Sequence, residues 1–154
     1  MLYSDLLAEA QGAMPERAHV ELGDGSRVTL RLAEYAHYRI GVTSNSHEAI
    51  RNVLIGCVEA MEESRPPRRV SIVHKVSNDD DGYADDSPVR RTQDNKIAQG
   101  GGDVVAGTAF FFSRSENILA FDWLFVDEAG QVGLAKMTAM GRSARNIVLV
   151  GDPQ

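Results

Sequence analysis

The chain has 154 residues and a formal net charge of −6, with 43% apolar and 25% charged residues. These values are ordinary for one globular domain, and the negative charge argues against a protein that coats nucleic acid by bulk attraction. The one cysteine, Cys57, cannot form an internal disulfide, so a reducing, cytoplasmic compartment is expected. The start, MLYSDLLAEAQG, lacks the pattern of a secretory signal, and no apolar run has membrane-spanning length.

Residues 1–37 differ from the rest of the chain in their sequence pattern. Helix formers in 2–13 predict a short helix before Pro15. In VELGDGSRVTLRL, residues 20–32, apolar and polar residues alternate around an Asp-Gly turn signal, which predicts a hairpin. We therefore expect 1–37 to form a helix and hairpin-like segment, and 38–154 to form the main domain.

From Tyr38 onward, short apolar runs alternate with amphipathic segments. Apolar positions from Ile50 to Met61 recur at helical spacing, and Asn45 followed by Glu48 predicts the start of that helix. The polar stretch 77–96 predicts a solvated loop, with a short helix near 94–99. This alternation predicts a three-layer α/β domain with a mainly parallel sheet. The expected strands are 38–43, 70–76, 103–106, 121–126 and the closing NIVLVGDPQ, and a further helix is expected over 131–141.

Ligands of open parallel sheets bind beyond the carboxyl ends of the strands. The expected strand ends carry hydroxyl, amide and carboxylate groups, which would therefore meet at one edge of the sheet. These ends are Thr43-Ser44-Asn45, Gly107-Thr108, Asp127-Glu128 with Gln131 just beyond, and Gly151-Asp152-Pro153-Gln154.

The pair Asp127-Glu128 directly follows the apolar run WLFV. A carboxylate at a strand tip can hold a hard cation, often through water, and a neighbouring carboxylate can accept a proton from an attacking water. The alternative is that Asp127 only caps the helix near Gln131. The apolar run ahead and GDPQ at the next strand tip favour a site for nucleotide hydrolysis.

These residues resemble a known family. DEAGQ (127–131) and VGDPQ (150–154) are similar to motifs II and III of superfamily 1 helicases, VTSNSHEAI (42–50) to motif Ia, and VVAGTA (104–109) to motif Ic. The resemblance is closest to the group that translocates 5′ to 3′, especially modules fused to RecB-like nucleases. It implies the first RecA-like domain of a helicase motor, a P-loop NTPase core that hydrolyses ATP to move along single-stranded DNA.

The resemblance also implies roles for individual residues. Asp127 would bind Mg²⁺ and Glu128 would be the catalytic base, with Gln131 beside it sensing the terminal phosphate or orienting the water. ATP, single-stranded DNA and the remainder of a helicase or nuclease-helicase chain would be the partners. The group that couples nucleotide to nucleic acid would be Gln131, Gly151, Asp152 and Gln154, and the contacts to the single strand would be Thr43, Ser44, Asn45, His47, Gly107 and Thr108.

The phosphate-binding loop GxxxxGK[ST] of this family does not occur in the sequence, and residues 1–37 stand in its place. Without that loop's backbone cradle and lysine, the β- and γ-phosphates lose most of their contacts. We therefore expect the polypeptide alone to be a poor ATPase and no helicase, as a truncated, rearranged or degenerate copy of a larger enzyme would be. The alternative is a non-catalytic module that binds single-stranded nucleic acid or acts as a scaffold.

The remaining features have simpler interpretations. Two of the three residues Phe110-Phe111-Phe112 are expected in the core, and the third could stack on a base. His74 is expected to be a satisfied structural residue and Cys57 a core residue. No zinc site is expected, because neither His47 nor His74 has a ligand partner at a recognisable spacing. Solvated surface is the expected setting of Asp79-Asp80-Asp81, Asp85-Asp86, Arg68-Arg69 and Arg90-Arg91.

Overall fold

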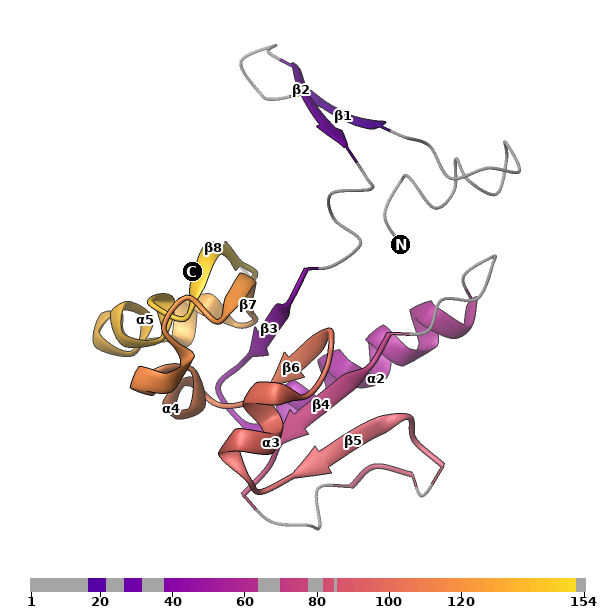
Figure 1. Ribbon diagram of the computed structural model, residues 1–154, viewed down its shortest axis with the longest axis vertical. Helices are drawn as coiled ribbons and strands as arrows, with labels where there is room; N and C mark the ends of the chain where they lie inside the picture. Colours follow the sequence, from indigo (N-terminus) through magenta and orange to yellow (C-terminus); the bar gives the residue numbers. More distant parts are fainter. Residues whose placement is uncertain are drawn as a thin grey trace. The chain divides into compact units, whose positions relative to one another are not determined.

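The computed structural model describes residues 17–21, 27–31, 38–63, 70–77, 82–84 and 86–151 (Figure 1). Strand β1 (Arg17–Glu21) pairs antiparallel with β2 (Arg27–Arg31), so the expected hairpin is confirmed. The helix expected over 2–13 lies outside the described residues. The hairpin and the larger sheet belong to separate compact units, and each is described by itself.

The larger sheet has six strands in the order β5-β4-β6-β3-β7-β8, and every neighbouring pair is parallel. The α/β class and the parallel sheet are therefore confirmed, in an arrangement consistent with a RecA-like core. The strands are β3 (Ile40–Thr43), β4 (Ile72–Lys75), β5 (Val89–Thr92), β6 (Val104–Ala106), β7 (Phe121–Val126) and β8 (Ala144–Leu149). The helices are α2 (His47–Glu63), α3 (Asn95–Gly100), α4 (Ala109–Phe112) and α5 (Leu134–Gly141), with 3-10 turns η2 (Ser115–Asn117) and η3 (Ala129–Gln131).

Helices cover both faces of this sheet. The connection from β3 through α2 to β4 runs in the opposite direction along the sheet from the later connections through α3, α4 and α5. Because such crossovers are right-handed, α2 lies on one face and the other three helices lie on the other. Side chains of β4 follow this division: Val73 packs in a cluster with Ala98 of α3, whereas the next residue, His74, contacts His47 of α2.

Phenylalanines of α4 pack against the sheet in the core. Phe112 is 1% exposed and packs edge-to-face on Phe121. Gly41 in β3 makes room for this packing, since a Cβ there would lie 2.8 Å from a Phe112 ring carbon and 2.9 Å from Leu124 Cδ1. Phe111 is also buried, whereas Phe110 is exposed, so the expectation that two of the three phenylalanines are buried is confirmed.

Several sequence expectations were wrong in detail. The stretch 77–96 is not all loop, because it contains the edge strand β5, whose Arg90 and Arg91 are exposed and whose four residues show no clear alternation. Helix α2 is capped by Ser46, whose Oγ accepts a hydrogen bond from Ala49 N at 3.0 Å, and not by Asn45. Cys57 is half-buried rather than in the core, and its burial raises the pKa of the thiol.

Two further elements complete the description. The helix expected from about residue 131 is divided into η3 and α5. Helix α4, which the sequence analysis did not predict, follows β6 directly. Within the described ranges, no helix has the length and apolar character that a membrane crossing requires.

Candidate functional site

The tips of β3 and β7 lie side by side at the carboxyl edge of the sheet. Asp127 N donates a hydrogen bond to Thr43 O at 2.9 Å, and Ser44 Oγ lies 3.4 Å from Asp127 O. Beyond them, Asn45 Nδ2 donates to Gln131 Oε1 at 3.1 Å. The structure therefore brings together residues that were predicted separately for nucleic-acid contact and for nucleotide chemistry.

The turn after β7 has an unusual backbone. Glu128 has φ 51° and ψ 40°, the left-handed conformation that few residues other than glycine adopt. Such strain is often found where function requires a particular side-chain position. The next residue, Ala129, donates its N–H to Val150 O at 2.9 Å, which ties this turn to the end of β8. A Cβ at Gly151 would lie 3.1 Å from Ala129 N, so glycine permits this close approach.

Asp127 carries a carboxylate that suits Mg²⁺, whereas the neighbouring Thr43 is buried. Asp127 is half-buried, whereas Thr43 is 1% exposed and its Oγ1 has no hydrogen-bond partner among the described residues. A carboxylate at a strand tip fits a hard cation that keeps several of its waters. Among all residues that the structure describes, no group of three or more His, Cys, Asp or Glu side chains is placed to hold a metal ion.

A pocket opens on the other side of β3, at the tips of β4 and β6. Its volume is about 240 Å³. Three of its lining side chains, those of His47, Lys75 and Arg114, are basic or can become so, and no described lining residue is acidic. The lining residues are His47, Lys75, Ser77, Asn95, Thr108, Phe110, Phe111 and Arg114.

The end of β6 shapes the wall of this pocket. Gly107 is buried, and a Cβ there would lie 3.0 Å from Phe111 Cδ1, so glycine lets the ring pack against the chain. Thr108 precedes α4, but its side chain makes no capping hydrogen bond. Phe110 is 77% exposed at the rim, with Lys136 Nζ 6.0 Å from the centre of its ring. The rim thus offers an aromatic surface beside cationic groups.

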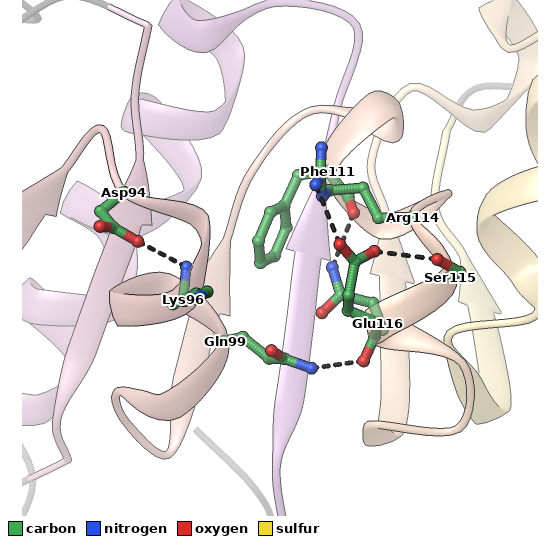
Figure 2. Close-up of polar contacts among 8 residues, drawn as sticks. Asp94, Lys96, Gln99, Phe111, Arg114, Ser115 and Glu116 are labelled. Atoms are coloured by element: carbon green, nitrogen blue, oxygen red, sulfur yellow. Dashed lines mark hydrogen bonds and ion pairs between the residues drawn. The ribbon is translucent and has the colours of Figure 1, made fainter.

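Arg114 is held by the turn that follows α4. Its Nη2 lies 3.0 Å from Glu116 Oε1, and Ser115 Oγ donates to the other carboxylate oxygen at 3.1 Å (Figure 2). Hydrogen bonds from the backbone N–H of Glu116, from Arg114 and from Ser115 lower the pKa of this carboxyl. Gln99 of α3 donates to the Glu116 carbonyl, which connects α3 to the same turn. Because this ion pair is exposed, its contribution to stability is small.

Histidines connect the pocket to the interior. His47 Nδ1 lies 3.3 Å from His74 Nε2, and His74 Nδ1 lies 2.9 Å from Tyr83 Oη. His74 is 0% exposed and hydrogen-bonded on both nitrogens, so its expected structural setting is confirmed. Burial, together with the smaller effects of the positive groups His47, Lys75 and Arg51, lowers the pKa of His74 to about 4.

The predicted site residues thus fall into two groups. His47 and Thr108 line the pocket, whereas the groups around Asp127 surround the tip of β7 and its contacts with β3 and β8. Asp152 and Gln154 lie outside the described residues. The sequence analysis did not single out Lys75, Ser77, Asn95 or Arg114. Ser77 directly follows the expected strand 70–76, so the carboxyl end of that strand locates it. Arg114 depends on the unpredicted helix α4.

The chain was also compared with known proteins. A scan against models of protein families finds no match, and a search of curated proteins finds no significant match. The functional argument therefore depends on the chemistry of these two groups of residues.

Proposed function

We propose that the chain is part of an ATP-dependent DNA helicase motor, in which ATP hydrolysis is coupled to movement along a single strand. The observation that carries this proposal is the hydrogen bond between Asn45 and Gln131. It joins the β3 tip, next to the basic pocket, to the turn that bears Asp127 and Glu128. A motor requires such a connection, because the nucleotide state must change the contacts with the strand.

The pocket suits the backbone of a single strand. Its volume of about 240 Å³ is below the range of roughly 300–1,000 Å³ typical of pockets that bury a whole small-molecule ligand. A sugar-phosphate unit is of a suitable size, and Lys75 and Arg114 supply charge for its phosphate. The exposed ring of Phe110 offers a surface for the attached base. A local basic pocket of this kind is compatible with a net charge of −6.

The tip of β7 suits the nucleotide. Asp127 would hold Mg²⁺, which when bound neutralises phosphate charge. Glu128 is exposed just beyond and would accept a proton from the attacking water. Gln131 would respond to the terminal phosphate, and Gly151 keeps the β8 tip close to this turn. We place this activity in the cytoplasm, in agreement with the single cysteine.

The second candidate is a non-catalytic module that binds single-stranded nucleic acid. One observation favours it: described residues line the pocket on several sides, whereas at the β7 tip they supply carboxylates and no comparable enclosure. The sequence also contains no Gly-Lys-Ser or Gly-Lys-Thr. Such a module would keep the α/β fold and the contacts with the single strand, but its acidic tip would bind no nucleotide.

Titration of a fluorescent ATP analogue, with and without Mg²⁺ and with and without an oligonucleotide, separates the two functions. A motor component binds nucleotide in a Mg²⁺-dependent manner, and Asp127→Asn weakens that binding. Glu128→Gln is the matched variant, because it should leave binding intact and remove any hydrolysis. A folded chain that binds the strand but no nucleotide would refute the motor and support the module.

A further inference from the structure

The two edges of the six-stranded sheet differ in chemistry (Figure 1). Strand β5 forms one edge, and its Arg90 and Arg91 are exposed, as is common at edges that stay unpaired. Among the described strands β8 forms the other edge, yet it carries the apolar run Ile147-Val148-Leu149. Continuous apolar runs are typical of parallel strands that are buried on both faces. The sequence of β8 therefore suits the interior of a sheet rather than its edge.

Apolar side chains are exposed on both faces of the sheet at β8. Ile147 is exposed and lies on the face of α5, since a Cβ at Gly141 would be 3.0 Å from its Cδ1. Leu149, two residues further, shares that face and is also exposed. On the other face, Phe125 of β7 is exposed beside the half-buried Val148. Contiguous apolar surface of this kind often marks a site of interaction.

The backbone of β8 offers hydrogen-bonding groups along this edge. Phe121 N donates to Ser143 O, and the residues that bond to β7 alternate along a parallel ladder. The N–H and C=O groups of Asn146 and Val148 therefore point away from β7. No described strand lies on that side of β8, so a further strand can pair there.

A two-fold axis at Ile147 lets β8 of one copy of the chain pair antiparallel with β8 of another. In this register Ile147 lies opposite its own equivalent, and Asn146 lies opposite Val148 of the second copy, twice by symmetry. Asn146 and Val148 are the residues whose backbone groups point outward, so each of these pairs can exchange both of its hydrogen bonds. The edge of β8 is therefore complementary to itself.

The charges of β8 allow this pairing. Arg145 is the one charged residue of the strand, and its Nε lies 3.7 Å from Asp122 Oδ1 of the same chain. In the symmetric register it lies opposite Leu149 of the second copy, and the two arginines are at opposite ends of the paired segment, roughly 14 Å apart. No pair of like charges in the strand therefore opposes the contact.

We propose that β8 is a dimerisation strand, which pairs antiparallel with β8 of a second copy of this chain and joins the two sheets into one. The apolar side chains at this edge are then covered by their equivalents in the second copy. This association goes beyond the function proposed above and does not depend on it, because neither the basic pocket nor the carboxylates of the β7 tip take part.

Sedimentation of the full chain over a range of concentrations tests the association. We expect the mass to rise from that of one chain to that of two and no further, because a two-fold contact uses the edge of both copies. Ile147→Lys places two positive charges opposite each other at the axis, and should raise the concentration at the midpoint of association at least about tenfold. Ile97→Lys is the matched control, since Ile97 is exposed on α3, and it should associate as wild type does.

Two results of this experiment would overturn the proposal. One is an Ile147→Lys protein that associates as strongly as wild type. The other is a wild-type chain that stays monomeric at every concentration. If the amides of Asn146 and Val148 in that monomer are protected from hydrogen exchange, another segment of the chain covers β8 instead.

A mixture of Ile147→Lys with Ile147→Glu tests the symmetry. Each variant alone places like charges across the axis and should stay monomeric, whereas the mixture places opposite charges there and should form heterodimers. Circular dichroism checks that both variants are folded, as the exposure of Ile147 leads us to expect. A mixture that stays monomeric while wild type dimerises would mean that Ile147 does not lie at the axis.

Disulfide crosslinking in a Cys57→Ser background measures the register directly. Ile147→Cys should form an intermolecular disulfide under mild oxidation, because opposing residues of a non-hydrogen-bonded antiparallel pair lie within bridging distance. Arg145→Cys, two residues away on the same face, is the matched control, since its two thiols would lie too far apart to bridge. Equal crosslinking of both variants, or none in Ile147→Cys, would contradict the register and the proposal with it.

Discussion

The two sides of β3 differ in charge and in how fully the described residues build a site. On the β4 and β6 side, Lys75 and Arg114 line a pocket of about 240 Å³. On the β7 and β8 side, Asp127 and Glu128 stand at one tip, and beside them β8 exposes apolar surface, with Leu149 58% exposed. Both sides are held to the same strand, so one scaffold presents a basic pocket and an acidic tip.

This difference shows that strand binding and nucleotide binding have different requirements. The pocket draws its walls from α2, β4, α3 and α4, all within the described chain. Among the described residues, the acidic tip has a carboxylate for a metal ion but few groups that could surround a triphosphate. Exposed apolar surface such as that of β8 often marks a contact with another segment. We therefore expect strand binding to be the more robust property of this polypeptide.

Acid should destabilise the protein through the pocket side. The pKa of His74 is about 4 in the folded chain and about 6.5 when unfolded, so the unfolded chain binds more protons between these values. Stability is therefore complete above about pH 6.5 and falls as the pH approaches 4, by up to about 3 kcal/mol. Urea unfolding at pH 7.5, 5.5 and 4.5 measures this effect. Asp127→Asn, on the other side of β3, should keep this pH dependence of stability, and His74→Gln should flatten it. If both variants lose the pH dependence equally, His74 is not its source.

Gly41→Val tests whether both sides depend on β3. The added carbons would meet Phe112 and Leu124, which are fully buried and have little room to move. Overpacking of this kind costs about 2 kcal/mol, measured as a shift of the urea midpoint. Gly56→Ala is the matched control, because a Cβ there meets nothing within 4 Å and alanine favours the helix. A Gly41→Val protein as stable as wild type would mean that the packing against β3 accommodates the added carbons.

Phe110→Ala tests whether a base stacks on the exposed ring at the rim of the pocket. If a base stacks on this ring, the affinity for dT should fall about tenfold, within the ~1–3 kcal/mol range of base–aromatic stacking. The affinity for an abasic strand, which lacks bases, should not change. Leu134→Ala is the matched control, because Leu134 is comparably exposed, at 81%, and lies in α5, which follows β7. A similar loss in Leu134→Ala would show that exposed apolar surface in general, rather than the pocket rim, binds the strand.

The smallest effect concerns the link between the two sides. A double-mutant cycle of Asn45→Ala and Gln131→Ala on the free energy of unfolding should give a coupling of about 0.5–1 kcal/mol, because the hydrogen bond is exposed. Additive effects of the two changes would mean that the 3.1 Å contact contributes nothing in solution.

The sequence predicted well the features that depend on periodicity. Residues 121–126 form β7 with the expected bounds, and helical spacing identified the two fully buried positions of α2, Ile50 and Leu54. Short elements were missed, because β5 and α4 have four residues each, which is too few for a repeating pattern.

The candidate site was predictable only where it follows strand tips. Asp127 and Thr108 could be located in this way, since parallel strands end at one edge. The pairing of His47 with His74 could not, because the two residues are 27 positions apart and meet only after α2 has packed on β4. Arg114 likewise reaches the pocket through a turn whose geometry local propensity does not determine.

The most direct measurement of the central claim compares two variants on opposite sides of β3. Equilibrium binding of a labelled dT oligonucleotide, without nucleotide and at two salt concentrations, is measured for wild type, the double variant Lys75→Ala/Arg114→Ala, and Asp127→Asn. We expect the double variant to lose at least about tenfold in affinity and to depend less on salt, because two phosphate contacts are gone. Asp127→Asn should bind as wild type does. If the double variant binds normally while Asp127→Asn does not, the strand lies at the β7 tip and the account is wrong.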